Sequence, residues 1–140
     1  MIVDFYHLSA SPLERVLPSI AEKVLAGEGR LLVVADEGLL GSLDEQLWTY
    51  AADSFLPHGT TGENQPVLLS AEPVAANGAR NIALADGVWR EEALGFDRAF
   101  YFFGSDSLDS ARGAWRALRG RDGVESRYWK QVDGRWVQGP

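Results

Sequence analysis

Short apolar runs that alternate with a longer amphipathic segment constrain the fold of this chain most. Ile2–Tyr6 and Leu31–Val34 are apolar runs bounded by polar residues, as is typical of buried strands. Between them, apolar residues recur every three or four positions over 13–25, which predicts a helix that begins after Ser11-Pro12. Strand, helix and strand in about 30 residues form a βαβ unit, so we expect a parallel strand pair with a right-handed crossover.

The remaining sequence repeats these signals and ends in a hairpin pattern. Further helices and strands are predicted as follows: helices at 42–48, with Ser42 as N-cap, and at 107–119; strands at 67–69, 81–84 and 98–103; a loop at 54–66. Asp133-Gly134, between two aromatic runs, predicts a C-terminal β-hairpin. We therefore expect one α/β domain over residues 1–140, with three α/β/α layers and a mainly parallel, Rossmann-like sheet.

The sequence lacks the common signatures of cofactor chemistry. It has no cysteine, which excludes disulfides and thiolate metal sites. The turn after the first strand, 7–12, contains no glycine, and no phosphate-binding loop occurs, so we expect no nucleotide site. No metal-ligand spacing stands out, and we predict no cofactor, no metal and no catalytic residue. A hydrolase triad that uses His7 or His58 stays open as an alternative, because triads assemble in space.

Charge is divided unevenly along the chain, whose net charge is −7. Residues 1–110 carry six Lys or Arg against seventeen Asp or Glu, whereas residues 111–140 carry seven against three. This division suggests two surfaces with different tasks, although ordinary variation on a solvated surface would also produce it. With no long apolar run and no basic leader, we expect a cytoplasmic protein with no membrane partner.

Two sequence pieces in the middle of the chain resemble a known family. Residues 43–48 read L-D-E-Q-L-W, and residues 54–58 read S-F-L-P-H. A helix of this pattern followed by such a loop resembles the chi subunit of DNA polymerase III, and the order of the later elements agrees. The resemblance implies that Phe55 belongs to a surface that binds the psi subunit or a helicase partner, with Trp48 as a neighbour. As an alternative, the leucines and the tryptophan of this helix are simply core residues.

A basic helix forms the second candidate surface. Arg112, Arg116 and Arg119 recur at steps of four and three, so they share one helical face, and Trp115 lies beside them. Such a site suits an acidic peptide that ends in an apolar residue and a free carboxylate. The family resemblance implies that this peptide is the C-terminal tail of single-stranded DNA-binding protein. Lys130 could extend the pocket; the other reading is a solvated arginine face with the tryptophan in the core.

The resemblance therefore implies a non-catalytic accessory subunit of the polymerase III clamp loader. It would link the polymerase to single-stranded DNA-binding protein in DNA replication and would contact DNA only indirectly. Two other classes stay open: a small α/β hydrolase or nucleotide-binding enzyme with a cryptic site, and a direct binder of single-stranded DNA that uses the basic C-terminal segment. The first predicts a deep pocket with perturbed acids or a histidine, and the second predicts DNA affinity without a protein partner.

Overall fold

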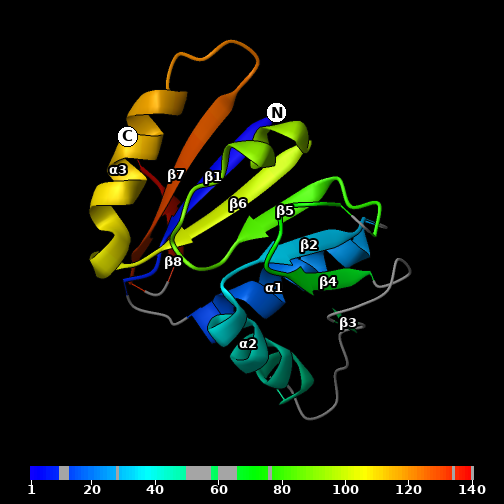
Figure 1. The fold of residues 1–140 in the computed structure, drawn as a ribbon. Helices are drawn as coiled ribbons and strands as arrows, with labels where there is room; N and C mark the ends of the chain where they lie inside the picture. The colour runs from blue at the N-terminus through cyan, green and yellow to red at the C-terminus, as the bar shows by residue number, and fades with distance from the viewer. Residues whose placement is uncertain are drawn as a thin grey trace.

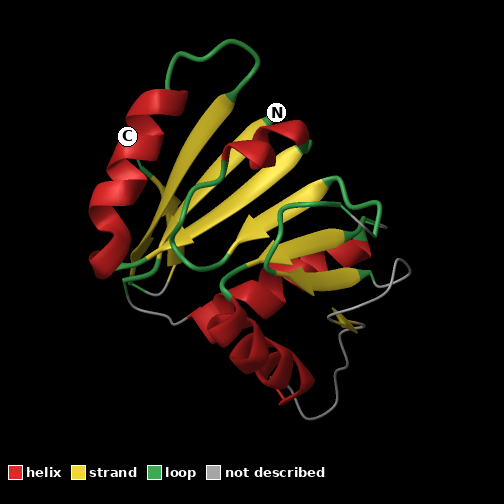
Figure 2. Cartoon of the chain, in the orientation of Figure 1, coloured by secondary structure: helices red, strands yellow, loops and turns green. Residues whose placement is uncertain are grey.

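The computed structural model describes residues 1–9, 13–27, 29–49, 58–59, 66–75, 77–133 and 135–139. Within these residues the chain folds as a sheet with helices on both faces (Figures 1 and 2). The strands are β1 (Ile2–His7), β2 (Leu31–Val34), β3 (His58–Gly59), β4 (Val67–Ser70), β5 (Asn81–Leu84), β6 (Arg98–Phe103), β7 (Glu125–Val132) and β8 (Arg135–Gln138). The helices are α1 (Leu13–Ala26), α2 (Glu37–Thr49) and α3 (Leu108–Leu118), with short 3₁₀ turns at Glu91–Gly95 and Ser105–Ser107.

The strands form a single sheet in the order β3-β4-β2-β5-β6-β1-β7-β8. Every neighbouring pair is parallel except β7 and β8, which form the predicted antiparallel hairpin around Asp133. The predicted α/β fold is therefore confirmed. β1 and β2 are parallel but not adjacent, because β5 and β6 lie between them. The two-residue strand β3 lies in a segment that the sequence predicts to be a loop.

Each face of the sheet carries its own apolar core. On one face, α1 and α2 pack on alternate side chains of the strands, such as Tyr6, Val33 and Phe102. On the other face, α3 packs on the side chains between them, such as Phe5, Leu32 and Phe103. This division follows from the two-residue period of a strand, which sends successive side chains to opposite faces. Figure 1 shows α3 on one side of the sheet and α1 and α2 on the other.

Helix α2 begins earlier than the sequence predicts. The prediction placed its N-cap at Ser42, but the helix starts at Glu37 and Ser42 lies inside it. The Leu39 backbone N–H donates to Asp36 Oδ1 at 3.0 Å, so Asp36 caps the helix. Gly38 and Gly41 are poor helix formers, so the sequence pattern did not indicate the first turns of α2. The predicted start of α1 at Ser11-Pro12 lies outside the described residues.

A buried carboxylate joins the C-terminal hairpin to the middle of the sheet. Asp4 on β1 is 0% exposed, yet it accepts hydrogen bonds from Arg98 on β6 and from Arg127 on β7. Trp129 Nε1 also donates to Asp4 Oδ1 at 2.9 Å. A buried charge is tolerated only when it is paired and hydrogen-bonded, and here two guanidinium groups and an indole fulfil this condition. Asp4 thus fixes β7, and with it β8, against β1.

Candidate functional site

Helix α3 presents the candidate basic surface because its sequence separates an apolar stripe from a charged one. Ala111, Ala114 and Leu118 are buried against the sheet, whereas Arg112, Arg116 and Ala117 are exposed. The helix ends where the Arg119 backbone N–H donates to the Trp115 carbonyl oxygen. Gly120 follows with a positive φ of 85°, a conformation that glycine adopts at a helix C-terminus without steric cost.

A pocket of about 350 Å³ opens between this helix and the sheet. We name it the α3 pocket. Its lining combines residues of α3 with the last residues of β1 and β6 and one residue from the middle of β7: His7, Phe103, Leu108, Ala111, Arg112, Trp115, Arg116 and Tyr128. Three residues that the sequence predicts for the peptide site, Arg112, Trp115 and Arg116, therefore lie around one hollow.

Aromatic rings build the floor of the α3 pocket. Trp115 is half-buried and packs edge-on against Phe5, with ring centroids 5.2 Å apart, and against Tyr128 at 6.0 Å. His7 stacks on Phe103 at 5.1 Å, and the Tyr128 hydroxyl lies 3.1 Å from His7 Nδ1, a hydrogen-bond distance. Rings that pack against one another in this way hold each other in place. The pocket is therefore a preformed hollow, with Trp115 both part of the core and part of the wall.

The charge at the rim of the α3 pocket is positive. Arg112 and Arg116 are exposed, and no carboxylate of a described residue lies within salt-bridge distance of either one. Burial raises the pKa of Tyr128, and the nearby Arg112 guanidinium opposes this rise. The tyrosine thus stays a neutral hydroxyl at ordinary pH, beside cations available to an anionic ligand. This arrangement can bind a carboxylate at the rim and an apolar side chain on the floor.

Two other residues predicted for this site lie further away. Arg119 is exposed at the C-cap of α3 and does not line the pocket. Lys130 follows Tyr128 by two residues on β7, so it projects from the same face of the sheet, but it does not line the pocket either. Both are placed to contribute long-range charge rather than direct contact.

The candidate partner surface lies largely outside the described part of the chain. Phe55 falls outside the described residues. Trp48 belongs to α2, but its side chain is likewise not described. Both residues remain predictions from the family motif.

Sequence reasoning missed three lining residues that come from the sheet: His7, Phe103 and Tyr128. His7 and Phe103 are the last residues of the parallel strands β1 and β6, which pair side by side at the carboxyl edge of the sheet. That edge is where open α/β sheets commonly bind ligands. The signal for His7 was therefore its place directly after the first apolar run.

The described residues contain neither a metal-binding cluster nor a membrane-spanning helix. No group of three or more histidine, aspartate or glutamate side chains there could hold a metal ion. No helix there has the length and hydropathy to cross a membrane.

The fold and the α3 pocket together define a class: an α/β domain with a cationic, aromatic pocket between α3 and the sheet. The family model for "DNA polymerase III chi subunit, HolC" matches residues 1–125, so the chain belongs to this family. The family is an accessory subunit of the replicative polymerase, which gives the chain a role in DNA replication. No curated protein matches the sequence significantly. The matched region ends at the first residue of β7, so the C-terminal hairpin follows it.

Proposed function

We propose that this chain links DNA polymerase III to single-stranded DNA-binding protein by holding the acidic C-terminal tail of that protein in the α3 pocket. One observation carries the proposal: Arg112 and Arg116, which are exposed and form no salt bridge with a described residue, flank the half-buried ring of Trp115 at the mouth of one hollow. The family resemblance implies the identity of the partner. The pocket supports this partner because it combines cations at its rim with an apolar floor.

The dimensions of the α3 pocket suit the end of a peptide better than a whole folded surface. A volume of about 350 Å³ lies near the lower end of the range for small-ligand sites, so it accepts one or two side chains. A terminal carboxylate would pair with a guanidinium group, and the last apolar side chain would pack between Trp115 and Tyr128. Further acidic residues of the tail would interact with Arg119 and Lys130 through weaker, screened attraction.

Charge reversal at the rim tests this proposal. Arg112→Glu with Arg116→Glu should reduce binding of a synthetic acidic tail peptide by a factor of at least about 100, since two charge-assisted contacts are replaced by repulsion. Isothermal titration calorimetry measures the affinity, and circular dichroism checks the fold. The matched control is Arg80→Glu with Arg30→Glu, which reverses two exposed arginines away from the pocket. Equal affinities for wild type and the rim variant would contradict the proposal.

A second tether completes the proposed adaptor. We propose that Phe55, with Trp48 nearby, binds the psi subunit or a helicase partner and so attaches the chain to the clamp loader in the cytoplasm. This part rests on the family motif at 43–48 and 54–58 alone. Phe55→Ala should abolish capture of the psi subunit while tail-peptide affinity stays unchanged. The adaptor would break no bond and would act by raising the effective concentration of its partners.

A further inference from the structure

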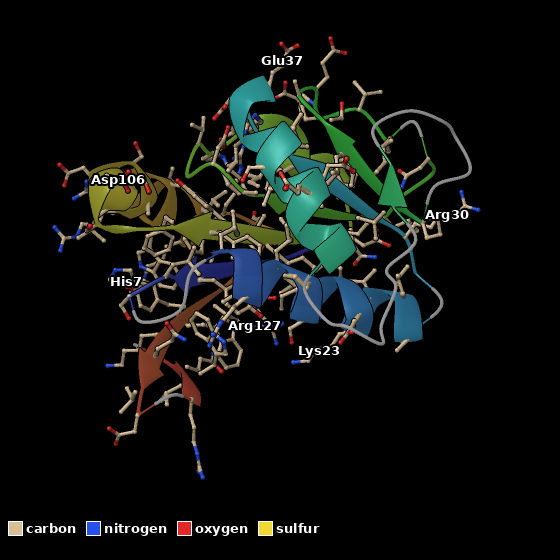
Figure 3. The ribbon with its side chains drawn as sticks, turned by 90° about the horizontal axis from the view of Figure 1, so that it is seen from below. His7, Lys23, Arg30, Glu37, Asp106 and Arg127 are labelled. Carbon is tan, nitrogen blue, oxygen red and sulfur yellow. The ribbon has the colours of Figure 1, made fainter. Side chains whose placement is uncertain are left out.

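A second, larger hollow lies on the opposite face of the sheet from the α3 pocket. It encloses about 620 Å³ between α1 and the C-terminal hairpin, over β1 and β6. We name it the α1 groove. One wall is α1, with Arg15, Ser19 and Lys23, and the other is the hairpin, with Trp129 and Trp136. In Figure 3, Lys23 extends from α1, and Arg127 lies between this helix and the hairpin.

The helix wall of the α1 groove carries a row of polar side chains. Arg15, Ser19 and Lys23 follow at steps of four residues, so they lie on one face of α1, and all three are exposed. At a rise of 1.5 Å per residue, the two cations are set about 12 Å apart along the helix axis. No described residue forms a salt bridge with either of them. This wall therefore presents two exposed positive charges and a hydroxyl to a bound ligand.

Positive charge is concentrated in the α1 groove although the protein is acidic. Residues 1–110 contain six Lys or Arg, and three of them, Arg15, Lys23 and Arg98, line this hollow. None of the groove-lining residues is Asp or Glu. Arg98 binds Asp4 with one edge of its guanidinium, yet it remains 40% exposed. The carboxylate of Asp4 is fully buried beneath it and shared with Arg127, so the accessible surface is cationic.

The floor and the hairpin wall are aromatic. Tyr6 is stacked with Trp129 at a centroid separation of 6.3 Å and meets Trp136 edge-on at 5.1 Å. Phe100 lies below, with the Arg98 guanidinium 4.7 Å from its ring centre. Both tryptophans are only half-buried. They belong to the hairpin, which follows the part of the chain that the family model matches.

From this arrangement we infer that the α1 groove binds single-stranded nucleic acid directly, with phosphates along Arg15 and Lys23 and bases against the tryptophans of the hairpin. A charged wall that follows the backbone, opposite aromatic side chains on which bases stack, is the general design of such sites. An acidic peptide fits less well, because the edge of the Arg98 guanidinium that could bind a carboxylate with paired hydrogen bonds already contacts Asp4. The inference goes beyond the proposed tail-binding role and does not depend on it.

Fluorescence anisotropy of a labelled oligodeoxythymidylate of about twelve nucleotides tests the inference with the intact chain at low salt. Arg15→Gln with Lys23→Gln should weaken binding about tenfold for each contact removed. For the wild type, the logarithm of the binding constant should fall with the logarithm of the salt concentration, with a slope of about 0.7 per phosphate contact. Trp136→Ala should weaken binding about tenfold through lost stacking. The control, Arg80→Gln with Arg121→Gln, removes two exposed positive charges that line neither hollow, and it should bind the oligonucleotide as wild type does.

The result that overturns the inference is equally defined. Absence of oligonucleotide binding by the wild type at low salt, or binding that the Arg15 and Lys23 substitutions leave unchanged, would refute it. Binding of a polyglutamate peptide at the α1 groove in place of DNA would refute it as well. Both substituted positions are exposed on a helix, so the variant should fold, and circular dichroism verifies this. Failure here would leave tail-peptide binding at the α3 pocket unaffected, so the two proposals fail separately.

Discussion

The α3 pocket and the α1 groove lie on opposite faces of one sheet and combine the same ingredients differently. Both place cations beside tryptophan, but the α3 pocket is about 350 Å³ and the α1 groove about 620 Å³. In the α3 pocket the arginines come from one helix and the tryptophan is fixed in the core. In the α1 groove, Arg15 and Lys23 come from α1 and the tryptophans from the opposite wall, the hairpin. Under the two proposals, the spacing of the cations and the rings, rather than the residue types, distinguishes a site for a peptide end from a site for a longer strand.

The two sites also differ in how they are held together. The tryptophan of the α3 pocket packs on Phe5, within the core of its face. The hairpin wall of the α1 groove depends on Asp4, which binds Arg127 and Trp129 across β1 and β7. Polar anchoring of this kind is sensitive to the loss of a single partner, because the others remain buried and unpaired.

Asp4→Asn should have the largest effect. It removes the buried charge that two guanidinium groups share, so the free energy of unfolding should fall by about 3 kcal/mol. Urea unfolding followed by circular dichroism measures this change. The matched control is Asp97→Asn, which breaks the exposed Arg80–Asp97 pair and should change the free energy of unfolding far less, because solvent screens that pair. Equal losses in the two variants would show that Asp4 does not anchor the hairpin.

Substitution of the wall tryptophans should separate the two sites. Trp115→Ala should lower the free energy of unfolding by about 2 kcal/mol, less than a fully buried tryptophan because the ring is half-exposed. Trp136→Ala, on the edge hairpin, should cost about 1 kcal/mol. Thermal unfolding of both variants checks the order. A larger loss for the Trp136 variant would reverse our account of which site belongs to the core.

Tyr6, which lines the α1 groove, should make the stability of the fold fall at alkaline pH. Burial, reinforced by the charge of Asp4, raises the pKa of Tyr6 to about 12 from its ordinary value of 10.0. A raised folded-state pKa means that the stabilising contribution is present below pH 10 and is lost as pH rises toward 12. Tyr6→Phe should therefore show a shallower loss of stability over this interval than wild type. If the two curves were parallel, Tyr6 would not carry this dependence.

Much of this fold could be predicted from the sequence, because its main strands are strongly apolar and bounded by polar residues or glycine. Helix α2 shows where prediction failed: two glycines near its start obscured the helix, and the cap was a side chain of Asp36 rather than Ser42. The order of strands was not predictable either. Long-range pairing, such as β1 between β6 and β7, depends on packing that local patterns do not encode.

The candidate sites were predictable only where one element carries the pattern. Arg112, Trp115 and Arg116 lie within one helix, so helical spacing brings them together. The α1 groove joins residues as distant as Arg15 and Trp136, which meet only because the hairpin pairs with β1 at the middle of the sheet. No local sequence motif indicates that these residues lie close together in the fold. Residues 1–110 are acidic overall, so their composition gave no indication that three of their cations, Arg15, Lys23 and Arg98, line the α1 groove.

The most direct test of the central claim is the pairing between the rim arginines and the terminal carboxylate of the tail. Calorimetry compares the free-acid and the amidated forms of one acidic tail peptide, on wild type and on Arg112→Gln with Arg116→Gln. The account predicts that amidation weakens binding to wild type by about tenfold or more and has little further effect on the variant. Equal affinity of wild type for the two peptides would contradict it.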